Sequence, residues 1–243
     1  MTHATQTPTE SGGSHAGNAA SEALASALRG WYGPGVAVAS APIDACPGRL
    51  PPAEAALVAT ACAQRRAEFV AGRMCARRAL AELGGQAEVI GIGPLRGPEW
   101  PTGFLGSIAH DAGFAAAAVT GVGRLSGLGI DLHACRSART YATIARQVVH
   151  GGDRLRGPPP RELTVAVGGD SGHAQCALVF AAKEAAVKVI SPIVGRYLSL
   201  SEFSAVIDGP VVTVTMAGRD DPIQGRWAWI DGAGILVGAW LSV

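Results

Sequence analysis

The order of apolar and polar positions in the first half of the chain predicts strands on either side of a helical region. Residues 36–43 are mostly apolar and are typical of a strand, and Pro51, after the turn that follows, favours the start of a helix. Helical sequence follows, in one piece or two, and residues 63–83 repeat strongly with the period of a helix. Gly84 supplies its stop.

The predicted helix over residues 63–83 has two distinct faces. At 100° per residue, one face is apolar and a second carries guanidinium groups within an arc of roughly 40°. The apolar face holds Phe69, Ala76, Leu80 and Leu83, and the basic face holds Arg66, Arg73 and Arg77. The basic face is either simply solvated or suited to bidentate phosphate binding, for which guanidinium forks have the right geometry.

The rest of the chain predicts several strands and one long helix. Residues 105–110 and 114–120 form two strands joined by a tight turn, and residues 128–132 form a third. Gly, Pro and charge dominate residues 150–172, which predicts a long loop. A helix over residues 176–191, ended by Pro192, comes next. Four more strands are predicted at residues 199–207, 211–216, 225–230 and 235–242. Segregated helices and strands of this kind favour an α+β fold over a doubly wound sheet.

Composition narrows the function classes. The 243 residues carry a formal net charge of +1 and a pI near 7.7, so no global field favours nucleic acid or an anionic membrane. Mean hydropathy is +0.25, but no apolar run approaches the length of a membrane span. Five scattered cysteines without a C-x-x-C pair indicate reduced thiols in a cytoplasmic protein and argue against zinc. Residues 1–20 are polar, lack a secretory pattern and are expected to be a disordered tail.

The strongest chemical signal is a pair of acids in apolar surroundings. Glu184 lies one helical turn before Lys188 on an otherwise apolar helix, and Asp131 lies in the strand over residues 128–132. Either Asp131 simply ends a strand and Glu184 is solvated, or both need a cation. Two carboxylates suffice for Mg²⁺, which keeps waters and phosphate oxygens in its shell. Two acids and a lysine therefore suggest metal-assisted phosphate chemistry.

Other polar residues have two interpretations. His133 projects to the same side of its strand as Asp131, so it is either a third metal ligand or, since imidazole binds magnesium poorly, a structural histidine. Ser107 and His110 border a tight turn, where a histidine donates to a phosphate or stabilises the turn. The sequence contains no Walker loop, no convincing dinucleotide fingerprint and no nucleophile elbow.

Six sequence blocks, taken in order, resemble the 4′-phosphopantetheinyl transferases, in particular their larger, monomeric, surfactin/enterobactin-type group. They are RAEF with GRMCARRAL (residues 66–69 and 72–80), WP (100–101), GSIAH (106–110), GID (129–131), FAAKEAAVK (180–188) and PIVGRYL (192–198). The likeness covers the chain from about Pro51 onward. It implies a pseudo-dimer of two similar α+β halves, here residues 21–125 and 126–243, with the active site in the cleft between them.

The resemblance also implies an activity. Members of the family transfer the 4′-phosphopantetheine arm of coenzyme A to a serine of an apo acyl or peptidyl carrier protein and release adenosine 3′,5′-bisphosphate. Polyketide, nonribosomal-peptide and fatty-acid carriers all remain open. The expected cofactor is Mg²⁺, with Mn²⁺ as the alternative, and the expected protein is a cytoplasmic monomer that binds neither nucleic acid nor membrane.

The family's functional positions map onto this chain residue by residue. Asp131 and Glu184 match the metal acids, Glu184 also acts on the acceptor serine, and Lys188 matches the catalytic lysine. Groups expected to hold coenzyme A phosphates are Arg66, Arg73, Arg77, Arg96 and His110, with Ser107 beside them.

Two departures from the family pattern stand out. His133 replaces the third acid that many relatives have, and Asp111 follows His110 where relatives often have Cys. The alternative function is therefore a catalytically impaired module that binds coenzyme A or a carrier protein, and a purely structural protein is third.

Overall fold

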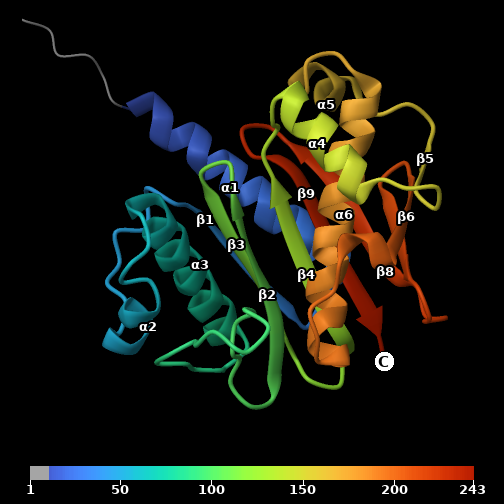
Figure 1. Cartoon of the computed structure of the whole chain (residues 1–243). Helices are drawn as coiled ribbons and strands as arrows, with labels where there is room; N and C mark the ends of the chain where they lie inside the picture. The colour runs from blue at the N-terminus through green and yellow to red at the C-terminus, as the bar shows by residue number, and fades with distance from the viewer. Residues whose placement is uncertain (1–10) are drawn as a thin grey trace, which may run out of the picture.

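Two sheets, each with a long helix packed against it, make up residues 11–243, which are the residues that the computed structural model describes (Figure 1). The first sheet is antiparallel and has the strand order β1-β3-β2. Its members are β1 (Val36–Pro42), β2 (Phe104–Asp111) and β3 (Phe114–Gly121). Helix α3 (Ala63–Glu82) covers one face, preceded by the short α2 (Pro52–Leu57), and α1 (Ser11–Tyr32) covers the other.

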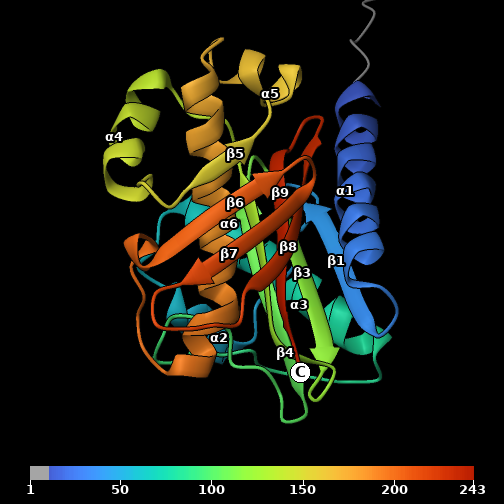
Figure 2. The same ribbon diagram turned by 90° about the vertical axis from the view of Figure 1, so that its right-hand side faces the viewer.

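The second sheet has six strands in the order β4-β9-β8-β7-β6-β5 and is antiparallel except where β5 pairs with β6. Its strands are β4 (Leu125–His133), β5 (Arg154–Arg156), β6 (Phe203–Asp208), β7 (Val211–Met216), β8 (Ile223–Ile230) and β9 (Gly234–Ser242). Helix α6 (Ser171–Val194) packs on it, with α4 (Ala138–Val148) and α5 (Arg161–Ala166) against α6 (Figure 2). A 3₁₀ turn, η1 (Leu200–Glu202), leads into β6. The predicted α+β class is confirmed.

The two sheets meet where β2 lies beside β4. Ser107 Oγ, on β2, accepts a hydrogen bond from the Ile130 backbone N–H, on β4, at 3.1 Å. The side chain thus satisfies a buried donor that the sheet ladder leaves open. The predicted boundary between residues 125 and 126 falls at the start of β4 and stays a prediction.

Helix α1 corrects the expectation of a disordered tail over residues 1–20. Residues 11–20 belong to this helix, and residues 1–10 lie outside the described part of the chain. Ala20, Leu24, Leu28 and Tyr32 recur every four residues and are all buried, which gives the helix a continuous apolar face. The Tyr32 hydroxyl donates to the Gly129 carbonyl at 2.8 Å. Helix α1, from the first half of the chain, thus contacts β4 of the second half.

Two expectations about α6 and the segment before it are also wrong. Residues 150–172 are not one loop, because they contain β5 and α5. Helix α6 begins at Ser171 because the carboxylate of Asp170 accepts from the His173 N–H at 2.9 Å, as an N-cap does. It continues past Pro192 and ends at Gly195, whose φ of 67° is the left-handed conformation typical of a helix end.

No helix among residues 11–243 is both long enough and apolar enough to cross a membrane.

Candidate active site

The contact between α6 and β4 forms the centre of the site. Two glycines of β4 let the helix backbone approach closely: a Cβ at Gly127 would lie 2.7 Å from the Val189 carbonyl, and one at Gly129 would overlap the Ala185 carbonyl. This packing places the Lys188 ammonium 2.8 Å from Asp131 Oδ1. The same ammonium donates to the Ile130 carbonyl at 2.8 Å. An acid and a lysine 57 residues apart are thereby joined in one partly buried ion pair.

The surroundings of Asp131 make its carboxylate unusually basic. Its side chain is buried, and burial raises its pKa to about 6. Lys188 opposes this rise, whereas the charges of Glu184 and Asp111 add to it. Three carboxylates therefore share one electrostatic field, and a further cation near Asp131 would be favoured.

Glu184 is the unpaired acid of the site. It lies on α6 one turn before Lys188 and is half-buried. Among residues 11–243 its carboxylate has no hydrogen-bond or ion-pair partner. The predicted Asp131, Glu184 and Lys188 are thus brought together, with one carboxylate free for a ligand or a proton.

The His133 side chain contacts α4 and α6 residues rather than the carboxylates of Asp131 and Glu184. Its Nε2 lies 3.1 Å from the Tyr141 hydroxyl, and its ring packs 5.1 Å from the ring of Phe180. Since the Tyr141 hydroxyl accepts from the Arg136 N–H at 3.1 Å, its own proton is available to the histidine nitrogen. Burial lowers the pKa of His133 to about 4. His133 is therefore a neutral, packed side chain whose Nε2 is already engaged.

Within the described residues, no group of three or more His, Cys, Asp or Glu side chains is arranged to hold a metal ion. The set of protein ligands that remains is Asp131 with Glu184. Hard carboxylate oxygens of this kind fit Mg²⁺, which completes its shell with waters and substrate oxygens.

The other half of the molecule contributes His110, from β2. Its Nε2 lies 2.5 Å from Arg65 Nη1, and its Nδ1 lies 3.4 Å from the carboxylate of Glu68. Burial lowers the pKa of His110, and the positive charges of Arg65 and Lys188 lower it further. Lys188 thus acts electrostatically on His110 across the two halves.

A small cavity of about 120 Å³ lies beside His110, and its lining carries three guanidinium groups and one carboxylate, that of Glu68, which lies 3.5 Å from Arg65. Its guanidinium groups belong to Arg65, Arg73 and Arg96. The buried Arg73 donates to the carbonyls of Ile90 and Gly91 at 2.8 and 2.9 Å and lies 4.2 Å above the ring of Phe69. Burial lowers the pKa of Arg73 to about 10, so the group remains charged at neutral pH. The cavity is the size of an anionic group rather than a whole cofactor.

Two of the predicted arginines do not line this cavity. Arg66 donates to the Ala61 carbonyl, and Arg77 pairs with the fully buried Glu54. Arg65 takes the place expected of Arg66. Arg65 recurs with Phe69 and Arg73 at the spacing i, i+4, i+8, but Arg66 lies nearer Arg73 around the helix axis, so periodicity alone did not decide between the two.

A larger cleft of about 390 Å³ runs between the halves from Arg96 to Lys188. Its walls are mainly apolar and include Trp100 on one side and Pro192 on the other. Ser107 lines this cleft as well, in addition to its bond to Ile130. A long, weakly polar ligand could therefore lie with one end at Lys188.

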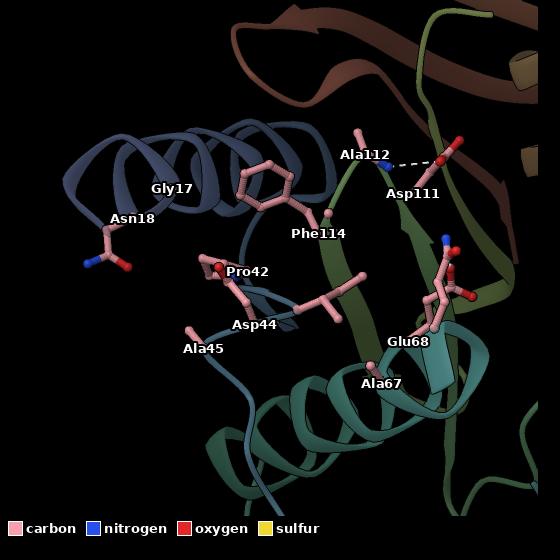
Figure 3. Close-up of a pocket in the computed structure, with 13 residues that line it drawn as sticks. Gly17, Asn18, Pro42, Asp44, Ala45, Ala67, Glu68, Asp111, Ala112 and Phe114 are labelled. Atoms are coloured by element: carbon pink, nitrogen blue, oxygen red, sulfur yellow. Dashed lines mark hydrogen bonds between the residues drawn. The ribbon is translucent and has the colours of Figure 1, made fainter. Parts of the chain in front are cut away.

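A third hollow, of about 910 Å³, opens between α1 and α3 (Figure 3). Glu68 and Asp111 stand at one end, as the figure shows, and Asp44 adds a third acid to its lining. Burial raises the pKa of Asp111, but hydrogen bonds from the Ala134 and Ala112 N–H groups and the charge of Arg136 hold it below its ordinary value. An acidic hollow does not suit phosphates, so the arginine-lined cavity is the better anion site.

Comparison with known proteins gives a consistent picture. Residues 53–120 match the model of the 4′-phosphopantetheinyl transferase N-terminal domain. The chain is 39% identical over 151 residues to the 4′-phosphopantetheinyl transferase Npt of Nocardia iowensis, covering 62% of this chain and 63% of Npt. It is 32% identical over 198 residues to the 4′-phosphopantetheinyl transferase Svp of Streptomyces mobaraensis, covering 77% and 76%. The match to PptT of Mycobacterium tuberculosis is 33% identical over 162 residues and covers 64% and 65%. The chain thus spans slightly less than two thirds of the length of Npt and of PptT.

Proposed function

This chain belongs to the 4′-phosphopantetheinyl transferase family, and we propose that it transfers the 4′-phosphopantetheine group of coenzyme A to a serine of an apo acyl or peptidyl carrier protein. One observation carries the proposal. The Asp131–Lys188 pair and the free Glu184 belong to one half, whereas His110 and the arginine-lined cavity beside it belong to the other. Arg96 of the first half and Lys188 of the second line the same cleft, and the charge of Lys188 reaches His110, so groups suited to hold phosphates lie near groups suited to act on them.

Coenzyme A binding is assigned by charge and by shape. Arg65, Arg73, Arg96 and His110 line the small cavity and bind phosphate, for which guanidinium groups offer paired donors. The pantetheine arm lies in the apolar cleft that ends at Lys188. Arg66 and Arg77 are left out of the assignment because they do not line this cavity and their guanidinium groups are engaged elsewhere, with Ala61 and Glu54.

Asp131 and Glu184 would hold the magnesium ion, or manganese in its place. When bound, the metal supplies positive charge to the pyrophosphate, where negative charge builds up during transfer. His133 is not included, because its Nε2 is engaged by Tyr141.

Glu184 and Lys188 handle the proton and the phosphate charge. Glu184 accepts the proton of the acceptor serine, directly or through a water, as the serine oxygen forms its bond to the phosphopantetheinyl phosphorus. The bond from that phosphorus to the oxygen of adenosine 3′,5′-bisphosphate breaks, and the bisphosphate leaves. Lys188 stabilises the phosphate or protonates the departing oxygen. The nucleophile comes from the carrier, so the chain needs none of its own.

The test measures both products. The enzyme is incubated with coenzyme A, magnesium and a panel of apo carrier proteins, and the carrier mass and released adenosine 3′,5′-bisphosphate are followed together. We expect equal amounts of modified carrier and bisphosphate from at least one carrier. If folded enzyme modifies no carrier in the panel, the proposal fails.

A catalytically impaired binding module is the second candidate, and the environment of His133 favours it. A neutral histidine held by Tyr141 stands where many relatives have an acid, which would weaken metal binding. Calorimetric titration with coenzyme A, with and without magnesium, separates the two when the transfer assay is run beside it. Binding without turnover would support the module.

A further inference from the structure

Residues 91–99, between α3 and β2, form a small closed loop that we call the cleft loop. The segment contains three glycines and two prolines, a composition typical of turns. Backbone hydrogen bonds close it. The Gly93 N–H donates to the Gly97 carbonyl at 2.9 Å, and the Glu99 N–H donates to the Gly91 carbonyl at 3.2 Å. The loop therefore holds its own shape, and its position is set by what its base and its tip contact.

The base of the cleft loop is anchored on both sides. Arg73, on α3, donates to the carbonyls of Ile90 and Gly91 at 2.8 and 2.9 Å. On the other side, the indole N–H of Trp100 donates to the carbonyl of Gly106, on β2, at 3.0 Å. The base is thus fixed to the first half of the molecule.

The tip of the cleft loop carries Arg96 in a strained conformation. Its φ of 64° lies in the left-handed region, which residues other than glycine, asparagine and aspartate rarely adopt. Such a conformation persists where the surroundings enforce it. Arg96 lines both the small anion cavity and the larger cleft. The position of the tip therefore decides where the Arg96 guanidinium group lies.

The second half of the molecule reaches this tip through Tyr197. The Tyr197 hydroxyl donates to the carbonyl of Pro94 at 2.9 Å, across the cleft. Among residues 11–243, it is the only side chain from outside the loop that hydrogen-bonds residues 94–96. Tyr197 is 62% exposed, so this hydrogen bond is not a by-product of core packing.

The backbone that carries Tyr197 is itself held in place. Just past the end of α6, Arg196 pairs with Glu202 through two hydrogen bonds at 3.1 and 2.6 Å. The Glu202 carboxylate also accepts from the Ser199 N–H at 2.9 Å. These bonds close residues 196–202 into a compact turn. The hydroxyl is thus presented from a fixed support to a loop tip that has few other restraints.

We propose that Tyr197 is a positioning residue that latches the cleft loop across the cleft and thereby holds Arg96 at the phosphates of bound coenzyme A. The proposal rests on the proposed function, because it takes coenzyme A as the ligand. Without the hydroxyl, the tip loses its hydrogen bond to the second half, and the left-handed Arg96 is free to relax toward ordinary backbone angles. The phosphates would then lose a well-placed guanidinium partner.

Direct contact with the ligand is the alternative role for Tyr197, since this residue lines the apolar cleft as well. The two roles affect different parts of coenzyme A. A direct contact acts on the pantetheine arm, whereas the latch acts on phosphate groups near Arg96. Adenosine 3′,5′-bisphosphate carries phosphates but lacks the pantetheine arm, so its affinity separates the two roles.

The test is a double-mutant cycle on ligand affinity. Wild type, Tyr197→Phe, Arg96→Ala and the double variant are titrated by calorimetry with coenzyme A and with adenosine 3′,5′-bisphosphate. We expect Tyr197→Phe to raise both Kd values about threefold to tenfold, as the loss of one hydrogen bond does. In the Arg96→Ala background the same substitution should change them by less than about twofold, because the group that the latch positions is gone.

Tyr32→Phe is the matched control. The Tyr32 hydroxyl also donates to a backbone carbonyl of the other half, that of Gly129, at 2.8 Å, but Tyr32 lines neither the cleft nor the anion cavity. Removing this buried hydroxyl should lower the Tm and leave both Kd values within about twofold of wild type. Tyr197→Phe should show the opposite pattern, with a nearly unchanged Tm and weaker binding.

The outcomes separate the latch from the proposed function. Unchanged Kd values for Tyr197→Phe overturn the latch, as do additive effects in the cycle or weaker binding of coenzyme A without weaker binding of the bisphosphate. In those cases transfer to a carrier protein still supports the proposed function. If the cycle shows the expected coupling but no carrier is modified, the latch stands and the proposed function fails. If the folded wild type binds neither ligand, both fail.

Discussion

Lys183 and Lys188 lie five residues apart on α6 and have different environments. The Lys183 ammonium is fully buried and donates to the Val148 carbonyl at 2.7 Å, to His150 Nε2 at 3.0 Å and to Asp153 at 2.9 Å. Burial lowers the pKa of Lys183, and the bond and charge of Asp153 oppose this. Asp153 in turn accepts from the Ala205 N–H at 2.8 Å. Lys183 therefore ties α4 and β6 to α6, whereas the partly exposed Lys188 faces the site.

Replacing these lysines should separate stability from activity. Lys183→Met leaves the Asp153 carboxylate buried without its cation, so we expect the free energy of unfolding to fall by about 3–5 kcal/mol. Lys188→Met should cost less stability, because Lys188 is partly exposed and Asp131, whose pKa burial raises to about 6, takes up a proton more readily, but it should remove most of the transfer activity. Chemical denaturation and the transfer assay measure the two effects. Comparable losses of stability in both variants would contradict the distinction.

Arg65 and Arg66 form a matched pair for testing the anion site. Of these two, Arg65 lines the cavity beside His110, whereas Arg66 donates to the Ala61 carbonyl. We expect Arg65→Ala to raise the KM for coenzyme A about tenfold, since a charge-assisted phosphate contact contributes roughly that much. Arg66→Ala should stay within about twofold of wild type. If Arg66→Ala has the larger effect in steady-state kinetics, the assignment of the cavity is wrong.

At the scale of secondary structure, the close approach of α6 to β4 determines the geometry of the site. Gly129 permits it, because a side chain there would overlap the Ala185 carbonyl. We expect Gly129→Ala to lower the free energy of unfolding by about 1–3 kcal/mol, as overpacking usually does, and to reduce transfer by shifting Lys188 from Asp131.

Gly151→Ala is the control for this substitution. A Cβ at that position meets nothing within 4 Å, so a surface change of about 0.5 kcal/mol or less is expected. Equal destabilisation by the two alanines, measured by urea unfolding, would show that helix contact is not the cause.

Several elements could be predicted because their signals are local. Helical periodicity and the glycines at 84 and 85 predicted α3. The tight turn around Gly113 was predicted as well, and the positive φ values of 53° at Ala112 and 82° at Gly113 confirm a two-residue hairpin. Helix α1 was missed because its segment is rich in small and polar residues and is held by tertiary burial of residues such as Leu24 and Leu28. The end of α6 was misplaced because Pro192 lies in the last turn, next to the left-handed Gly195.

At the scale of the whole molecule, the site depends on both halves. Asp131, Glu184 and Lys188 could be chosen from the sequence, because charge in apolar surroundings is itself informative. The environment of His133 could not, since Tyr141 and Phe180 reach it only through tertiary packing. The choice between Arg65 and Arg66 likewise depended on the rotation of α3 against β2, which periodicity alone leaves open.

Metal binding tests whether the two acids act as a pair. We expect magnesium to stabilise the wild-type protein against thermal unfolding, by about 2.7 kcal/mol when magnesium reaches a hundred times its Kd. Asp131→Asn and Glu184→Gln should each lose most of this stabilisation, and chelation should reverse it in the wild type. Undiminished stabilisation of both variants in differential scanning fluorimetry would contradict a site formed by these carboxylates.

Single-turnover transfer to an apo carrier protein, read by intact mass, tests the central claim most directly. Wild-type enzyme with coenzyme A and magnesium should add one phosphopantetheine group to the acceptor serine. Under the same conditions Glu184→Gln should add essentially none, although it still binds coenzyme A. An unmodified carrier after incubation with folded wild-type enzyme, or full modification by Glu184→Gln, would contradict the account.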